Sequence, residues 1–125
     1  MSMPPKRIAD DTGRACVHAA LAGDGGRDTT ATAVRFLLQR LAEDAEGNTV
    51  EIRVPPFGAV QAIQGPRHSR GTPPNVVETD AATWIALATG SLDWAEAVVA
   101  GSVTASGQRA NLGEHLPIAW ETIGE

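Results

Sequence analysis

The chain has 125 residues, a length typical of one domain, and a formal net charge of −5 at pH 7. Hydrophobic residues make up 42% and charged residues 20%, which argues against an intrinsically disordered chain. The acidic balance argues against a main role in binding nucleic acid or anionic membranes. We therefore predict a single domain over residues 1–125, with residues 1–9 disordered.

No targeting or membrane-spanning segment is expected. The apolar runs are shorter than the roughly 20 residues that a membrane span needs, and the opening MSMPPKRIADD turns polar at once. The single cysteine, Cys16, excludes an intrachain disulfide and fits a reducing compartment, so we predict a cytoplasmic protein. Small neighbours on a predicted helix favour a half-buried structural thiol over a reactive one.

Two helices are expected at the start of the fold. The first covers residues 11–22, with Asp10 or Asp11 as its cap, and a loop follows over residues 23–28. The second covers about residues 30–45, where apolar side chains recur at helical spacing. We interpret this stripe as core in preference to the lining of a cavity; it consists of Val34, Leu37, Leu38, Leu41 and Ala45.

Strands follow these helices. Apolar and polar residues alternate along residues 49–54, and residues 57–63 are nearly all apolar or small. The two segments are expected to pair as an antiparallel hairpin around Pro55 and Pro56. A short third strand is predicted over residues 76–79.

The second half is predicted to hold two short helices and a last strand. Asp80 is a strong N-cap candidate for the first helix, and Gly90 occupies its C-terminal glycine position. Asp93 has capping-box spacing to Glu96 and begins the next helix, before a strand over residues 102–106. The buried stripe of that helix is expected to contain Trp94, Ala97 and Val98.

A basic loop, GPRHSRGTPPN, interrupts the otherwise acidic chain. Its side chains Arg67, His68 and Arg70 lie among glycines and prolines that restrict the backbone, which suits the binding of phosphate, sulfate or carboxylate. The alternative is a solvated surface loop whose charges offset acids such as Glu78 and Asp80. Charged loops are more often of this second kind.

No sequence motif for catalysis is present: GxSxG, HExxH, CxxC, P-loop and GxGxxG patterns are all missing. The histidines His18, His68 and His115 fall on separate predicted elements and lack metal-ligand spacing. We therefore predict a protein that is not an enzyme, with no catalytic residue, no metal ligand and no cofactor.

Trp84 and Trp94 fall on consecutive short helices and could meet at the wall of a ligand pocket. Plain core packing is the more typical role, because tryptophans bury a large area in small domains. An apolar pocket would have to be lined by Leu37, Leu41, Val60, Ile63, Trp84 and Trp94.

The run ETDAATWIALATGSLDWAEAVVAGSVTASGQRANLGEHLPI resembles the sterol-carrier-protein type-two fold family. The shared pattern is an acidic cap, a helix ending in Leu-x-x-Gly, a second helix ending in Gly, and a strand closing on Gly. Together with RVPPFGAVQ and GPRHSRGTPPNVVETD, it is most similar to the small sterol-carrier-like proteins of actinobacteria. The resemblance implies an α+β fold, with helices covering a curved, mostly antiparallel sheet of about five strands and leaving an apolar tunnel.

Family members with a known role bind fatty acyl chains, sterols or other lipids. The resemblance therefore implies a non-catalytic binding module for a small hydrophobic or amphipathic ligand. From the acidic balance, we expect no nucleic acid as partner. The alternative is a protein-interaction or enzyme-accessory module that docks a protein partner through the loop at residues 65–75.

Overall fold

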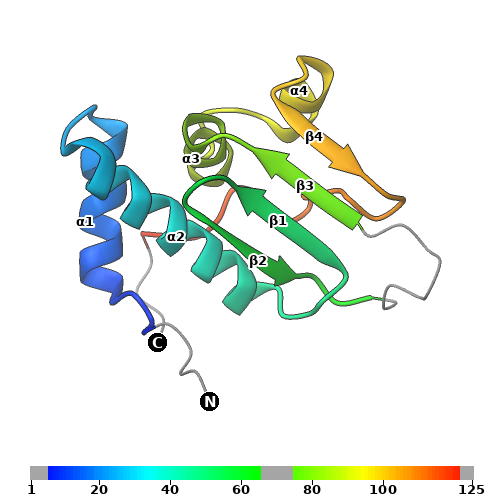
Figure 1. The fold of residues 1–125 in the computed structure, drawn as a ribbon, viewed down its shortest axis with the longest axis horizontal. Coiled ribbons are helices and arrows are strands. Elements are labelled where there is room, and N and C mark those ends of the chain that lie inside the picture. Colours follow the sequence, from blue (N-terminus) through cyan, green and yellow to red (C-terminus); the bar gives the residue numbers. More distant parts are fainter. Residues whose placement is uncertain (1–5, 66–74, 122–125) are drawn as a thin grey trace.

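The computed structural model describes residues 6–65 and 75–121 (Figure 1). Along these residues the elements are α1 (Asp10–Leu21), α2 (Gly26–Asp44), β1 (Val50–Val54), β2 (Gly58–Ala62), β3 (Asn75–Thr79), α3 (Ala81–Thr89), α4 (Trp94–Val99) and β4 (Val103–Ser106). The described strands form one sheet in the order β2-β1-β3-β4. β1 is antiparallel to β2 and parallel to β3, and β3 is antiparallel to β4. The predicted α+β class is confirmed, with four described strands instead of about five.

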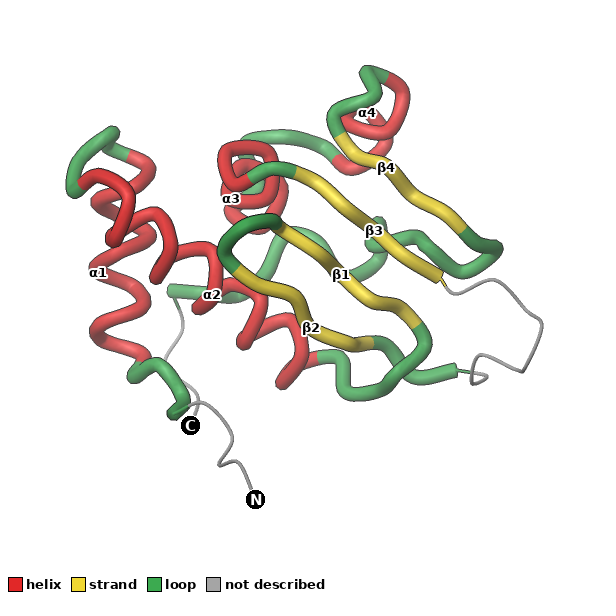
Figure 2. Tube along the Cα trace, in the orientation of Figure 1, coloured by secondary structure: helices red, strands yellow, loops and turns green. Residues whose placement is uncertain are grey.

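α1 and α2 lie on the β2 side of the sheet, and α4 lies next to β4 (Figures 1 and 2). α2 packs along β2 and against α3, and α1 packs on α2. The burial of β1 alternates as the sequence predicted, because Val50, Ile52 and Val54 are buried while Arg53 is exposed. One face of the sheet therefore carries the core, and the other presents polar side chains such as Arg53 and Glu78.

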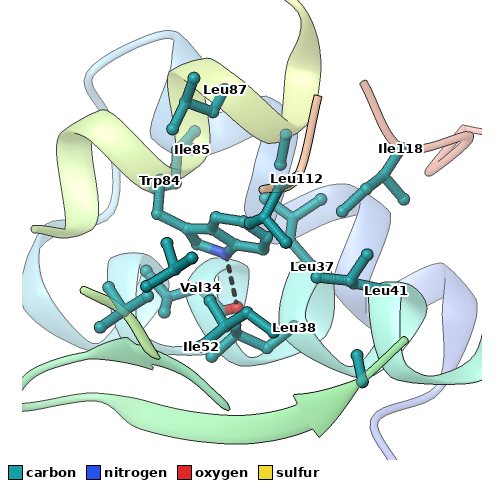
Figure 3. Packing of buried hydrophobic residues seen from close by; sticks show 14 of the residues in the cluster. Val34, Leu37, Leu38, Leu41, Ile52, Trp84, Ile85, Leu87, Leu112 and Ile118 are labelled. Carbon is teal, nitrogen blue, oxygen red and sulfur yellow. Dashed lines mark hydrogen bonds between the residues drawn. The ribbon is translucent and has the colours of Figure 1, made fainter. Parts of the chain in front are cut away.

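Trp84 on α3 lies at the centre of the core and is fully buried (Figure 3). Its indole Nε1–H donates a hydrogen bond of 3.3 Å to the backbone oxygen of Val34 on α2, which joins the two helices. The stripe predicted on the second helix is core, as interpreted from its spacing, except that Ala45 at its end is only half-buried. The buried cluster also includes Phe36, Leu37, Leu38, Leu41, Ile52, Ile85, Leu87, Leu112 and Ile118.

The starts of α1 and α2 differ from the sequence prediction. α1 begins at Asp10, and its N-cap is Ala9, which makes no side-chain capping bond. α2 begins at Gly26 instead of about residue 30, directly after Gly25 in a left-handed conformation with φ of 92°. Two consecutive glycines suggested a loop, but here both adopt positive φ, 92° at Gly25 and 70° at Gly26, and lead directly into the helix.

The two aspartate caps are confirmed. The Asp80 carboxylate accepts a hydrogen bond of 2.8 Å from the Thr83 N–H, and the Asp93 carboxylate accepts one of 3.3 Å from the Glu96 N–H. The predicted stripe of α4 is wrong for Val98, whose side chain is 40% exposed. A helix as short as Trp94–Val99 presents little surface to the core, and Ala97 is its buried residue.

Gly13 allows α1 to approach α2 closely. A Cβ atom added at this position would lie 2.1 Å from Cδ1 of Phe36, a side chain that is fully buried in the core. Gly13→Ala should favour the helix by about 1 kcal/mol, yet overpacking of a core typically costs about 1–3 kcal/mol. We expect a net loss of stability in urea denaturation. A Gly13→Ala protein as stable as the wild type would mean that the helices separate without cost.

Candidate functional site

A groove of about 580 Å³ runs between α2 and the edge strand β2. Its apolar lining comes from both elements and from the segment that precedes α1: Ile8, Leu38, Phe57 and Val60. The volume falls in the range of about 300–1,000 Å³ that is typical of small-molecule sites. The groove can therefore hold an apolar group of several carbon atoms.

The helical side of the groove is built by one face of α2. Thr32, Arg35 and Gln39 lie three and four residues apart, so they project in the same direction. Arg35 donates a hydrogen bond of 2.8 Å from Nε to the backbone oxygen of Phe57. That bond uses one of the five N–H donors of the guanidinium and fixes its charge beside the groove.

The N-terminal segment forms a third wall. The Ile8 N–H donates to Oε1 of Gln39 at 2.9 Å, and Nε2 of Gln39 donates back to the Ile8 oxygen at 2.8 Å. Arg7 pairs with Glu43 on α2 and with Asp10. These contacts hold Arg7 and Ile8 against α2. Both residues belong to the segment 1–9, which was predicted to be disordered.

The pairing of Arg7 with Glu43 is a bidentate one, through Nε and Nη2 of the guanidinium. Hydrogen bonding from Arg7 holds the pKa of Glu43 below its usual value, and the same bond raises the pKa of Arg7. Both side chains are therefore ionised at neutral pH. The ion pair is largely exposed, so its main effect is to position the chain next to the groove.

Positive charge gathers around this groove in an acidic protein. Lys6 and Arg35 both line it, and the Arg27 guanidinium lies 5.1 Å from the centre of the Phe57 ring. Such a cation over an aromatic face is a favourable contact. An apolar lining beside two cationic side chains suits a ligand that has an apolar part and an anionic part.

The residues predicted to line one apolar pocket are separated in the structure. Leu37, Leu41 and Trp84 are 0–1% exposed and belong to the core cluster (Figure 3). Val60 lines the α2–β2 groove. Trp94 lines a smaller pocket of about 170 Å³ at the start of α4.

Ile63 lines a polar pocket of about 610 Å³ at the end of α2, together with Glu43, Glu46, Glu114 and His115. Its φ of 72° is a left-handed conformation that β-branched residues rarely adopt.

Within residues 6–65 and 75–121, no group of three or more His, Cys, Asp or Glu side chains is arranged to hold a metal ion.

The basic side chains Arg67, His68 and Arg70 lie outside the described residues, so an anion site in that loop stays a prediction. The sequence analysis did not single out Lys6, Arg35 or Phe57. Helical spacing places Arg35 on the polar side of its helix, which is a weak signal. Their convergence depends on the packing of β2 and of the N-terminal segment against α2, and a local pattern does not reveal such long-range contacts.

The family model described as "Bacterial SCP ortholog" matches residues 26–118. This range begins with α2 and includes every described strand and both short helices. No curated protein matches the chain. Within the described part of the chain, no helix is long and apolar enough to cross a membrane. The chain belongs to the bacterial family of sterol-carrier-protein-like proteins.

Proposed function

We propose that this protein is a non-catalytic binding module for a small amphipathic lipid, held in the α2–β2 groove. The apolar chain lies on Leu38, Phe57 and Val60, and the anionic head lies near Lys6 and Arg35. The observation that carries the proposal is the meeting of an apolar lining and two cations in one groove of about 580 Å³. Membership of a sterol-carrier-like family supports a lipid as the ligand.

Approximate free energies favour a ligand that has both an apolar chain and an anionic head. Burial of each methylene contributes about 0.8 kcal/mol, so roughly ten carbons contribute about 8 kcal/mol. Association costs about 4–15 kcal/mol in lost translational and rotational freedom, which ranges from half of that gain to more than all of it. A charge-assisted hydrogen bond to the head adds about 1.5–3 kcal/mol, and this addition decides whether binding is measurable. A charged head is therefore part of the proposal.

A surface groove is favoured over an internal tunnel by the packing of the core. Large side chains of the core cluster, among them Trp84, Phe36 and Leu87, are 0–1% exposed. Protein interiors are packed about as densely as organic crystals, so an internal ligand would have to displace such side chains. The groove accepts a ligand without that displacement.

Dodecanoate, used below its micelle concentration, should raise the melting temperature in a concentration-dependent way. A ligand at about 100 times its dissociation constant adds about 2.7 kcal/mol of stability, or about 10 °C for a domain of this size. Differential scanning calorimetry would measure the shift. Dodecanol, which lacks the charge, serves as the control and should give a smaller shift. No shift with fatty acids of several chain lengths would contradict the proposal.

A further inference from the structure

β2 forms a free edge of the sheet within the described part of the chain. It pairs with β1 on one side, and no described strand lies on its other side. Its sequence, Gly-Ala-Val-Gln-Ala, contains no proline and no charged residue. Proteins usually protect an edge with such residues, because an open edge presents unpaired backbone N–H and C=O groups.

The open part of this edge lines the groove. Gly58, Ala59 and Val60 are consecutive lining residues. Residues of an antiparallel strand alternate between directing their N–H and C=O groups at the paired strand and away from it. At least one of these three residues therefore directs its backbone groups away from β1, toward the free edge.

α2 packs along β2 and forms the other wall of the groove, and it makes a hydrogen bond just before the strand begins. Arg35 donates to the Phe57 oxygen, immediately before β2 begins. No described side chain or backbone group outside the sheet makes a hydrogen bond to Gly58, Ala59 or Val60. Main-chain groups on an open edge bind an extended chain by adding it as a further strand, and amides are the groups that pair in this way.

We propose that the ligand of the groove is an N-acylated amino acid, or the N-acylated end of a peptide. The shared chemistry is an acyl chain, an amide and a nearby carboxylate. The acyl chain lies on Leu38 and Phe57, the amide pairs with the edge of β2, and the carboxylate lies near Lys6 and Arg35. This inference rests on the proposed function, since it names the class of amphipathic ligand that the groove takes.

A simple fatty acid can pair with fewer of the groups that the groove presents. Its carboxylate can reach the cations and its chain can cover the apolar lining, but it has no N–H donor for an edge C=O. An acyl amide supplies a donor and an acceptor at the point where the apolar chain ends. The groove offers cations, apolar surface and a strand edge together, and an acyl amide with a carboxylate matches all three.

The test compares two ligands that differ in one group. N-dodecanoylglycine contains the amide, and its ester counterpart, O-dodecanoylglycolate, replaces the amide N–H by oxygen while keeping the chain and the carboxylate. Titration calorimetry should show that the amide binds roughly 2- to 12-fold more tightly, the range that one hydrogen bond contributes. Dodecanoate is the third ligand, because it tests the proposed function alone.

Hydrogen exchange followed by NMR gives an independent readout of the edge. The amide ligand should slow exchange of at least one backbone N–H among Gly58, Ala59 and Val60. The backbone N–H groups of β4, at the opposite margin of the sheet, serve as the control and should not change. This measurement requires no substitution in the strand, so a folding defect cannot mimic the result.

The outcomes separate the two proposals. Equal affinity for the amide and the ester, with unchanged exchange in β2, overturns the acyl-amide inference and leaves lipid binding intact. Absence of binding by all three ligands overturns both. An unacylated acidic peptide that binds as tightly as its N-dodecanoyl form also overturns the inference. Tighter binding of an N-dodecanoyl peptide than of N-dodecanoylglycine supports the acylated peptide as the source, and equal binding supports the free acyl amino acid.

Discussion

Trp84→Ala is expected to lower the free energy of unfolding by about 3–5 kcal/mol. The side chain is fully buried at the contact of α2 and α3, and its removal leaves a cavity among residues that cannot all collapse into it. The hydrogen bond from its indole to the Val34 oxygen is lost as well. Urea denaturation, with the slope of the transition compared between the two proteins, measures the change.

Trp84→Phe is the matched control, because it keeps an aromatic ring in the core and removes the N–H donor. Val34 lies inside α2, where its oxygen can still accept the helical hydrogen bond, so no buried acceptor is left unpaired. We expect a loss of about 1–2 kcal/mol for this variant. A loss below about 1 kcal/mol for Trp84→Ala would contradict the central position of Trp84 in the core.

Arg35→Gln should weaken the binding of dodecanoate roughly tenfold. A charge-assisted hydrogen bond is worth about 1.5–3 kcal/mol, and the lower end applies because Arg35 is exposed to water and its charge is screened. The affinity for dodecanol should stay the same, since that ligand has no charge. Titration calorimetry at low and high salt measures both ligands.

Arg53→Gln is the control for this experiment. Arg53 is equally a surface arginine, but it lies on β1, on the polar face of the sheet, and pairs with Glu51. The same loss of one positive charge at that position should leave dodecanoate binding unchanged. Equal weakening in both variants would mean that the net charge of the protein, and not the groove, determines the affinity.

Local patterns predicted much of the fold. β1 and α2 each bury one side, so their apolar residues recur with the period of a strand and of a helix. This spacing was enough to predict both elements. Asp80 and Asp93 were predicted as caps because a carboxylate at that position pairs with a backbone N–H of the first turn. Each of these patterns is contained within one short segment of the sequence.

Features that depend on distant contacts were not predictable in the same way. The start of α2 at Gly26 depends on the left-handed turn at Gly25, and glycine is equally common in loops. The small size of Gly13 is what Phe36 requires, and this contact between α1 and α2 is not visible in the sequence around either residue. The parallel pairing of β1 with β3 joins segments separated along the chain by β2 and the basic loop.

The candidate site depends on such distant contacts throughout. Val60 was predicted to line a pocket and does line the groove, but Leu37, Leu41 and Trp84 belong to the core. Lys6, Arg35 and Phe57 come from three segments that meet because both β2 and the N-terminal segment pack against α2. No spacing rule connects residues so far apart in the sequence.

The most direct test of lipid binding in the groove is a dodecanoate titration followed by methyl NMR. Ile8, Leu38 and Val60 supply methyl groups at the groove, while Val98 and Val99 supply exposed methyl groups on α4. Lipid binding in the α2–β2 groove predicts saturable shifts at Ile8, Leu38 and Val60, with little change at Val98 and Val99. Shifts confined to Ile63 or to α4, or no saturable shift at any methyl group, would contradict it.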